Sequence, residues 1–211
     1  MADYQLYCFA QSGNTYKPAL MLNLCGADWT PRFVDFFNGE TRSEAFRAIN
    51  PMGEVPVLDH GGKILTQSGI ILDYLAEQFG RFGANDEDER REIWRWILFD
   101  NHKLTSYIGT YRFLVRFAKT GETPVTEFLK GRLRSALRVL DGHLRDRDFV
   151  ATDRPTIADL SLVGYLFWPD EFDVTWDHYP AIEAWLKRIE ALPGWVHPYE
   201  LVPGHPLPDA D

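Results

Sequence analysis

The sequence contains little cysteine, and this limits the kinds of site it can form. Only two of its 211 residues are cysteine, Cys8 and Cys25. Two thiols do not make a disulfide framework, and their spacing is neither C-x-x-C nor that of metal ligands. We therefore expect no metal site. Both thiols are interpreted as small buried hydrophobic side chains, with a reactive thiol as the alternative.

The sequence also lacks an excess of basic residues and any long apolar run. With 22 Lys and Arg against 31 Asp and Glu, the net charge is −9, whereas nucleic-acid binders need a basic surface to displace phosphate counterions. No apolar run approaches the roughly 20 residues of a membrane-spanning helix, and residues 1–10 lack the pattern of a signal peptide. We expect a cytoplasmic protein that binds neither nucleic acid nor membrane.

Apolar runs and turn residues predict the element order β-α-β-α-β-β-α for residues 1–80. Pro18 fits the first helix only in its first turn, so Asn14 or Thr15 is its predicted N-cap. This order is the one that a thioredoxin-like domain requires. The predicted elements are strands over residues 4–9 and 32–37, helices ending at Gly26 and spanning 44–49, and then a hairpin and a third helix.

Strand signals stop after a linker at residues 80–85, and residues 86–205 read as an all-helical bundle. Thr156 and Asp159 form a variant of the capping box at the start of one of these helices. The fold class is therefore α/β followed by all-α. Further helices are expected over 87–118, 125–144 and 179–192, with a loosely held tail from Leu201 to Asp211.

The most constrained stretch of the chain runs from Asn50 to Tyr74. Pro56 interrupts a strand, and because proline donates no ladder hydrogen bond, the position must be an edge, a bulge or a turn; we predict a cis bond after Val55. The backbone groups of Val55 are then left for an extended peptide. Ser68 is the predicted N-cap of the next helix, whose N-terminus could bind a carboxylate.

The runs NPMGEVPVL and TQSGIILDYLAEQFG resemble the second half of the N-terminal domain of the glutathione S-transferase family. The resemblance implies that the backbone of Val55, held by Pro56, binds the cysteinyl part of glutathione. It also implies that Gln67 and Ser68 bind the γ-glutamyl carboxylate. Glutathione would then be the cosubstrate. The alternative is a structural turn and an ordinary helix cap that bind no ligand.

A glutathione-dependent enzyme must raise the thiolate fraction of its cosubstrate, because the thiolate is the nucleophile. A short donor at a helix N-terminus would do so by stabilising the anion. Ser12 resembles the donor of the serine-type, theta-like classes, and the Ser-Gly-Asn triplet that ends at Asn14 resembles a bacterial, nu-like branch. Tyr7 is a weaker match to the tyrosine-type classes, and a capped turn without a ligand is the alternative.

Three charged residues are further candidates. Lys17 and Arg42 are candidate cations for the glycyl carboxylate, although the histidine that theta-like relatives place near Arg42 is missing. The resemblance implies that an acid such as Asp100 reaches the α-amino group of glutathione on the other subunit of a homodimer, with a surface acid as the alternative. Aromatic side chains of the helical domain either line a hydrophobic electrophile pocket or form core: Tyr107, Tyr111 and Trp168.

The function that the resemblance implies is that of a dimeric glutathione transferase, which joins the thiolate to an electrophilic small molecule. Two other functions remain open. The same site could catalyse glutathione-dependent disulfide reduction or isomerisation, or the chain could be a non-catalytic ligand-binding module.

Overall fold

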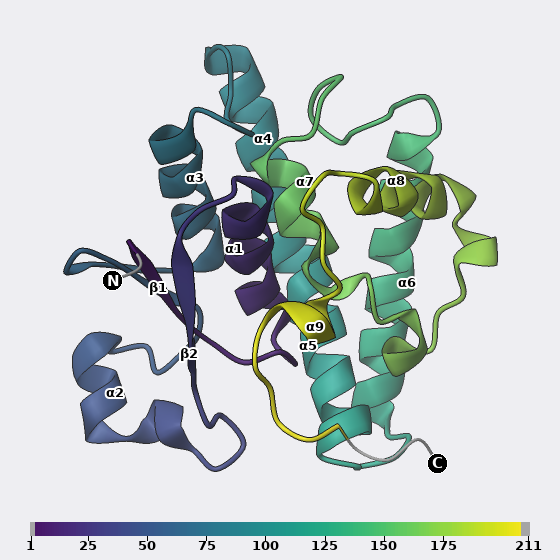
Figure 1. Ribbon diagram of the computed structural model, residues 1–211. Coiled ribbons are helices and arrows are strands. Elements are labelled where there is room, and N and C mark those ends of the chain that lie inside the picture. The colour runs from purple at the N-terminus through teal and green to yellow at the C-terminus, as the bar shows by residue number, and fades with distance from the viewer. Residues whose placement is uncertain (1–2, 208–211) are drawn as a thin grey trace. The chain divides into compact units, whose positions relative to one another are not determined.

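The computed structural model describes residues 3–207 (Figure 1). The chain divides into two compact units. The first contains the residues up to Gly83 together with Leu192–Pro206, and the second contains Ala84–Ala191. The boundary after Gly83 falls inside the predicted linker, but the predicted second domain is too long, because its last residues belong to the first unit.

A four-stranded sheet forms the centre of the first unit. Its strands are β1 (Tyr4–Cys8), β2 (Trp29–Phe33), β3 (Val57–His60) and β4 (Lys63–Thr66), arranged in the order β2-β1-β3-β4. β1 pairs with β2 in parallel, and the other two pairs are antiparallel. Alternate residues of β1, namely Tyr4, Leu6 and Cys8, are buried and the two between them are half-buried, because successive side chains of a strand point to opposite faces of the sheet.

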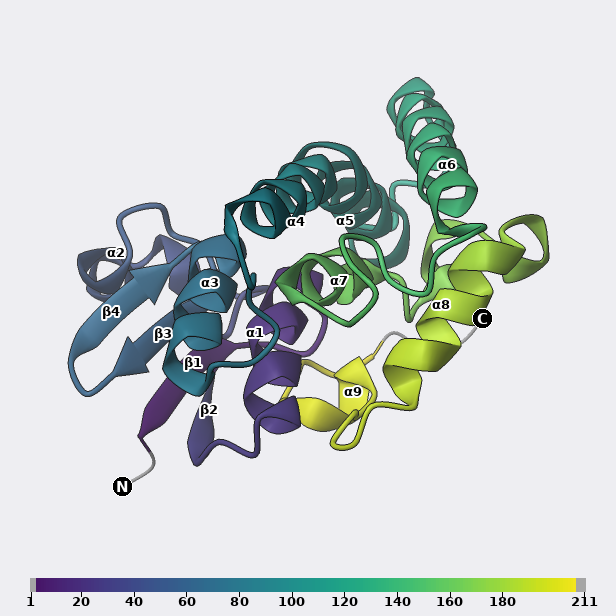
Figure 2. The same cartoon turned by 90° about the horizontal axis from the view of Figure 1, so that it is seen from above.

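Helices complete the predicted β-α-β-α-β-β-α order. They are α1 (Gly13–Leu24), α2 (Glu44–Ile49), preceded by the short 3-10 helix η1 (Glu40–Arg42), and α3 (Ser68–Phe79). α1 and α3 pack against each other (Figure 2), and α2 lies apart from this pair (Figure 1). α3 ends at Gly80, whose φ of 59° is the left-handed conformation that glycine tolerates best. The thioredoxin-like prediction is confirmed.

The second strand lies earlier than predicted, at Trp29–Phe33 instead of residues 32–37. Proline is rare inside strands, yet Pro31 is paired opposite Leu6. β2 is an edge strand whose one neighbour in the sheet is β1. The N–H that Pro31 lacks would face away from β1, so its absence removes no hydrogen bond of the ladder.

The predicted cap of α1 is also wrong. Ser12 is the N-cap, and its Oγ accepts a hydrogen bond from the Thr15 N–H at 3.3 Å. Pro18 therefore lies inside the helix rather than in its first turn. Since Pro18 has no N–H, the Asn14 carbonyl loses its usual helical partner, and the first turn of α1 is held by its cap instead.

Within the first unit, residues 198–205 pack against α1 and the turn before it, which contradicts the prediction of a loose tail for the described residues from Leu201 onward. The short helix α9 (Pro198–Leu201) lies beside α1 (Figure 2). The Ala10 N–H donates to the Pro203 carbonyl at 2.9 Å. The Gln11 side chain binds the His205 backbone twice, with Nε2 donating to the carbonyl at 2.7 Å and Oε1 accepting from the N–H at 3.1 Å. Residues 208–211 lie outside the described residues.

Gly204→Ala is expected to lower the free energy of unfolding by about 1–3 kcal/mol, because an added methyl group overpacks this contact. A Cβ at Gly204 would lie 2.6 Å from the Ala10 Cβ and 2.9 Å from the Gln11 Oε1. Chemical denaturation measures the change. Gly131→Ala is the control: no atom lies within 4 Å of its added Cβ in α6 (Pro124–Leu144), so alanine should stabilise the helix. Equal effects at both positions would contradict the prediction.

The second unit is helical throughout. Its principal helices besides α6 are α4 (Glu87–Phe99), α5 (Ser106–Arg112), α7 (Ile157–Leu162) and α8 (Pro180–Glu190). Its shorter segments are the π-helices η2 (Asp100–Thr105) and η3 (Phe113–Phe117) and the 3-10 helices η4 (Val163–Tyr165), η5 (Pro169–Phe172) and η6 (Trp176–His178). The predicted long helix over 87–118 is thus α4 and α5 joined and extended by π-helical turns.

The Thr156–Asp159 capping box is present at the start of α7. The Thr156 Oγ1 accepts from the Ala158 N–H at 3.3 Å, and the Asp159 Oδ2 accepts from the Thr156 N–H at 2.8 Å. The other oxygen of Asp159 accepts from the Val150 N–H and the Trp185 Nε1, both at 3.0 Å. Asp159 is fully buried, so this carboxylate joins the loop before α7 to α8.

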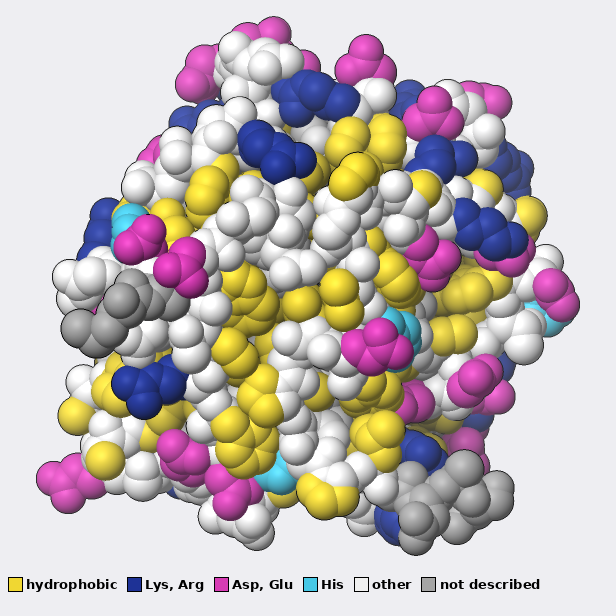
Figure 3. Space-filling model, viewed as in Figure 1, with side chains coloured by type: hydrophobic (Ala, Val, Ile, Leu, Met, Phe, Trp, Pro, Cys, Tyr) yellow, Lys and Arg dark blue, Asp and Glu magenta, His cyan; other side chains and the backbone are white. Residues whose placement is uncertain are grey.

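The surface shows no dominant basic region on the face drawn in Figure 3, where Lys and Arg side chains lie among acidic ones. This distribution fits the net charge of −9. Among the described residues, no helix combines the length and the apolar character needed to cross a membrane.

Candidate active site

The first turn of α1 presents two of the predicted site residues. Ser12 is only 7% exposed, and its N–H donates to the Phe9 carbonyl at 3.1 Å. Its Oγ uses a lone pair as the cap, which leaves the hydroxyl hydrogen able to donate. The first turns of α1 and α3, both fully described, contain no acidic residue, so the positive ends of these helices are not neutralised locally.

Asn14 connects α1 to α3. Its Oδ1 accepts a hydrogen bond from the Lys17 Nζ at 2.9 Å and another, weaker one from the Ser68 Oγ at 3.4 Å. No hydrogen bond from the Asn14 Nδ2 to another residue is described within residues 3–207. A residue predicted to act on the thiol of glutathione, Asn14, is therefore in contact with one predicted to bind the γ-glutamyl carboxylate, Ser68.

Lys17 does not have the predicted role. Its side chain has no exposed surface, and its ammonium group donates to Asn14. A cation that binds the carboxylate of a ligand must reach the surface of the site. The prediction that Lys17 holds the glycyl carboxylate is therefore wrong, and the residue instead contacts a predicted catalytic side chain.

The Val55-Pro56 bond is cis, as predicted. The ladder of the sheet begins at Val57, which is paired with both Thr66 and Tyr7. Val55 therefore lies just outside the strand pairing, and its backbone can pair with an extended ligand.

The start of α3 differs from the prediction. Gln67, not Ser68, is the N-cap, and it makes no side-chain capping bond; Ser68 is the first helical residue. Gln67 has a φ of 68°, a conformation that costs a residue with a side chain about 1–3 kcal/mol and is concentrated at functional sites. Its Nε2 donates to the Glu54 Oε2 at 3.2 Å. Nothing in the sequence pattern singles out Glu54 except its position before Val55.

Two predicted charged residues have different outcomes. Arg42 is exposed on η1, and within residues 3–207 the structure describes no partner for its guanidinium, so its role stays a prediction. Asp100 is only 1% exposed, and its oxygens accept from the Thr105 Oγ1 at 2.9 Å and the Ser161 Oγ at 2.6 Å. Both interpretations of Asp100 are wrong, because a buried carboxylate is neither a surface acid nor able to reach a second subunit.

Three aromatic candidates and one thiol contribute to packing. Tyr7 packs edge to face on Phe46, with ring centroids 6.3 Å apart. Tyr111 and Trp168 are buried, and the Arg112 guanidinium lies 3.9 Å from the centroid of a Trp168 ring. Burial raises the pKa of the Cys8 thiol to about 12, which rules out a reactive thiolate there at neutral pH.

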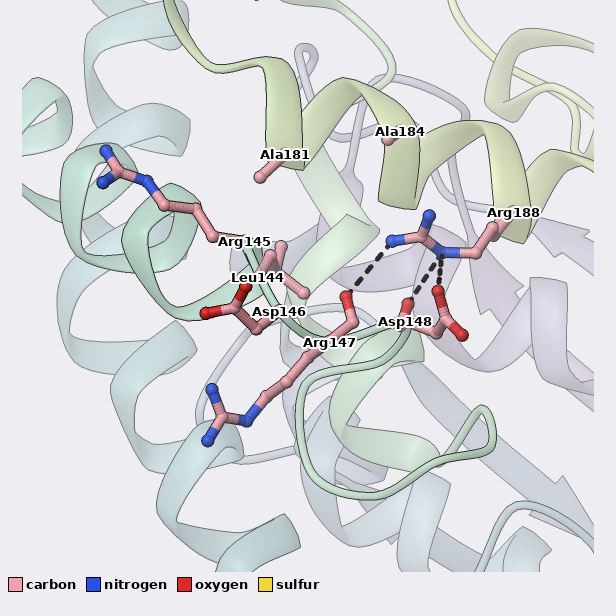
Figure 4. A pocket seen from close by; sticks show the side chains of 8 residues that line it. All are labelled: Leu144, Arg145, Asp146, Arg147, Asp148, Ala181, Ala184 and Arg188. Carbon is pink, nitrogen blue, oxygen red and sulfur yellow. Dashed lines mark hydrogen bonds and ion pairs between the residues drawn. The ribbon is translucent and has the colours of Figure 1, made fainter.

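A hollow in the helical unit lies between the end of α6 and α8 (Figure 4). Arg188 crosses it, with Nε donating to the Asp148 carbonyl at 2.9 Å and an ion pair to the Asp148 carboxylate at 3.6 Å. Arg145 and Arg147 are directed away from Arg188 in the close-up. The residues that line the hollow include none of the predicted site residues, so it is not the candidate active site.

Comparisons with known proteins agree with this description. A family model described as the N-terminal domain of glutathione S-transferase matches residues 2–77, and one described as its C-terminal domain matches residues 104–193. The chain is 30% identical to glutathione S-transferase F14 of Arabidopsis thaliana over 93% of this chain and 83% of that protein. It is 32% identical to a maleylacetoacetate isomerase of Rhizobium meliloti over 89% of this chain and 91% of that protein.

A solved structure of similar fold is that of a possible glutathione S-transferase from Rhodopseudomonas palustris. It has a TM-score of 0.88 and 36% sequence identity, and the match covers 93% of this chain and 98% of that one. Matches of this extent in both halves confirm the predicted fold class and the predicted family of enzymes. The chain belongs to the glutathione S-transferase family.

Proposed function

We propose that this chain uses glutathione as its cosubstrate and joins the glutathione sulfur to a hydrophobic, electrophilic small molecule. The observation that carries the proposal is the meeting of Asn14 and Ser68 at 3.4 Å. This contact brings the N-terminus of α1, where a thiolate would be stabilised, next to the N-terminus of α3, where a carboxylate would bind.

In this proposal each part of the tripeptide has its own partner. The backbone of Val55 pairs with the cysteinyl unit, and Pro56 holds that backbone outside the sheet. Ser68 and the strained Gln67 bind the γ-glutamyl carboxylate, and exposed Arg42 is the candidate for the glycyl carboxylate.

Ser12 and Asn14 supply the chemistry by donating hydrogen bonds to the sulfur. Hydrogen bonds to the charged form lower the pKa of a thiol, so the bound thiolate fraction rises at neutral pH. The thiolate then forms a C–S bond to the electrophilic carbon, and the leaving group departs with the electron pair of the broken bond.

Calorimetric titration with glutathione, followed by a panel of aryl halides, epoxides, hydroperoxides and mixed disulfides, tests the proposal. We expect saturable binding and stoichiometric loss of glutathione with at least one carbon electrophile. Absence of binding would overturn it. Binding with no shift of the thiol pKa and no turnover would favour the non-catalytic ligand-binding module.

An isomerase is the second candidate, because a maleylacetoacetate isomerase is 32% identical to this chain. In a glutathione-dependent isomerisation the thiolate adds to the substrate and later leaves, so glutathione is regenerated. Product formation without net loss of glutathione would favour the isomerase over the transferase. Oxidation of glutathione by the mixed disulfides of the panel would instead favour the reductase.

Ser68→Ala is expected to raise the KM for glutathione about tenfold, because the variant loses one hydrogen bond to the charged γ-glutamyl carboxylate. The free energy of unfolding should fall by no more than about 0.5 kcal/mol, because Ser68 makes no capping bond and loses only its long, weak hydrogen bond to Asn14. Ser43→Ala is the matched control for folding: Ser43 is the N-cap of α2 and accepts from the Phe46 N–H at 3.1 Å, so its loss should cost about 1 kcal/mol. An unchanged KM in Ser68→Ala would remove this residue from the site.

Assembly is also part of the proposal. We propose a homodimer, and sedimentation equilibrium of the full chain measures its mass directly. A monomer at micromolar concentration would contradict it.

A further inference from the structure

Lys17 is a buried cation beside a predicted catalytic side chain. It has no exposed surface, and its Nζ lies 2.9 Å from the Asn14 Oδ1. The two residues are three positions apart in α1, so they share one face of the helix. An ammonium group removed from water must be compensated by hydrogen bonds, and the Asn14 amide supplies one of them.

This contact fixes which way the Asn14 amide faces. A lysine ammonium has three donors and no acceptor, so only the oxygen of the amide can lie against it. Ser68 donates to the same oxygen. With Oδ1 held by two donors, the NH2 group must point the other way, and within the described residues it has no acceptor of its own. An amide that could otherwise rotate by 180° is held in one orientation.

From this geometry we infer that Lys17 is a positioning residue, which orients the Asn14 amide so that its NH2 group donates to the glutathione thiolate. The inference rests on the proposed function. The charge-assisted bond from Lys17 also polarises the amide and strengthens its opposite N–H as a donor. Lys17 thus acts on the sulfur through Asn14, without contact with the ligand.

Titration of glutathione bound to the full-length protein, followed by thiolate absorbance in the ultraviolet, tests this inference. Lys17→Met keeps a long, unbranched side chain but removes the donor. We expect it to raise the pKa of the bound thiol by about 0.5 to 1 unit, since a weakened hydrogen bond to the anion shifts the pKa upward. The acidic limb of the pH profile of kcat/KM should move by the same amount.

Asn14→Asp is a second variant that does not depend on the stability of Lys17→Met. A carboxylate still accepts from Lys17 and Ser68, but it replaces the NH2 donor with an acceptor that repels the thiolate. We expect a rise of the thiol pKa of more than about one unit while the thermal unfolding temperature stays unchanged or rises. An unchanged thiol pKa in Asn14→Asp would overturn the inference.

The double variant Asn14→Ala with Lys17→Met separates orientation from a direct effect of charge. If Lys17 acts through Asn14, Lys17→Met adds nothing to the thiol pKa once the amide is gone. An equal added shift in both backgrounds would mean that Lys17 acts through space, and would overturn the positioning role. If the unaltered protein itself does not lower the thiol pKa, the catalytic part of the proposed function fails instead.

Discussion

Asp159→Ala is expected to lower the free energy of unfolding by about 3–5 kcal/mol, the largest stability change that we predict. The carboxylate is fully buried and accepts from Thr156, Val150 and Trp185. Alanine would leave these donors buried without partners, and each unpaired donor costs roughly 1–3 kcal/mol. The remaining structure can recover part of this cost only by admitting water.

Chemical denaturation of Asp159→Ala and of Asp146→Ala provides the comparison. Asp146 is an exposed acid in the loop after α6, and its removal should change the free energy of unfolding by no more than about 0.5 kcal/mol. The loss of unfolding free energy in Asp159→Asn should lie between those of the two alanine variants. Its amide keeps one acceptor oxygen but turns an NH2 group toward a donor. A loss of less than about 1 kcal/mol in Asp159→Ala would show that its hydrogen bonds contribute little.

Local signals in the sequence predicted local structure well. The Thr156–Asp159 capping box depends on two residues three positions apart. The cis bond depends on Pro56 and the residue before it. Each feature can therefore be predicted from a few neighbouring residues. The order of strands and helices followed from apolar runs in the same way. The displaced second strand shows the limit of this approach, since only the edge position of β2 in the sheet makes Pro31 acceptable there.

Contacts between distant parts of the chain were not predictable. Gln11 and His205 are 194 positions apart, and no pattern in the tail indicated that it docks beside the turn that contains Ser12. The buried site of Asp100 depends in the same way on Ser161, 61 positions away.

The Lys17–Asn14 contact is a different case, because an i, i+3 pair on a helix is visible in the sequence. Pro18 places the predicted start of the helix at Asn14 or Thr15, so the sequence does not predict Asn14 and Lys17 on one helical face. With Ser12 as the N-cap, Asn14 and Lys17 both lie in α1, and Lys17 contacts the site through the Asn14 amide.

Ser12→Ala is expected to raise the pKa of bound glutathione by about one to two units and to lower kcat/KM about 10-fold to 100-fold at neutral pH. One lost hydrogen bond to a charged group is worth roughly 1.5–3 kcal/mol, which corresponds to this shift. Ser12 is the stronger candidate for the main donor because its hydroxyl can accept from the Thr15 N–H and donate to the sulfur at once. Asn14 is the second donor, through its NH2 group.

Thiolate absorbance of bound glutathione in Ser12→Ala, Asn14→Ala and Ser12→Thr decides between the two donors. Ser12→Thr retains a hydroxyl and should keep most of the pKa shift. Since Ser12→Ala also removes a helix cap worth about 1 kcal/mol, Thr123→Ala is the matched control: it removes the N-cap of α6 and should leave the thiol pKa unchanged. If Asn14→Ala raises the thiol pKa while Ser12→Ala does not, the roles are reversed; if neither variant moves it, thiolate stabilisation by the first turn of α1 is excluded.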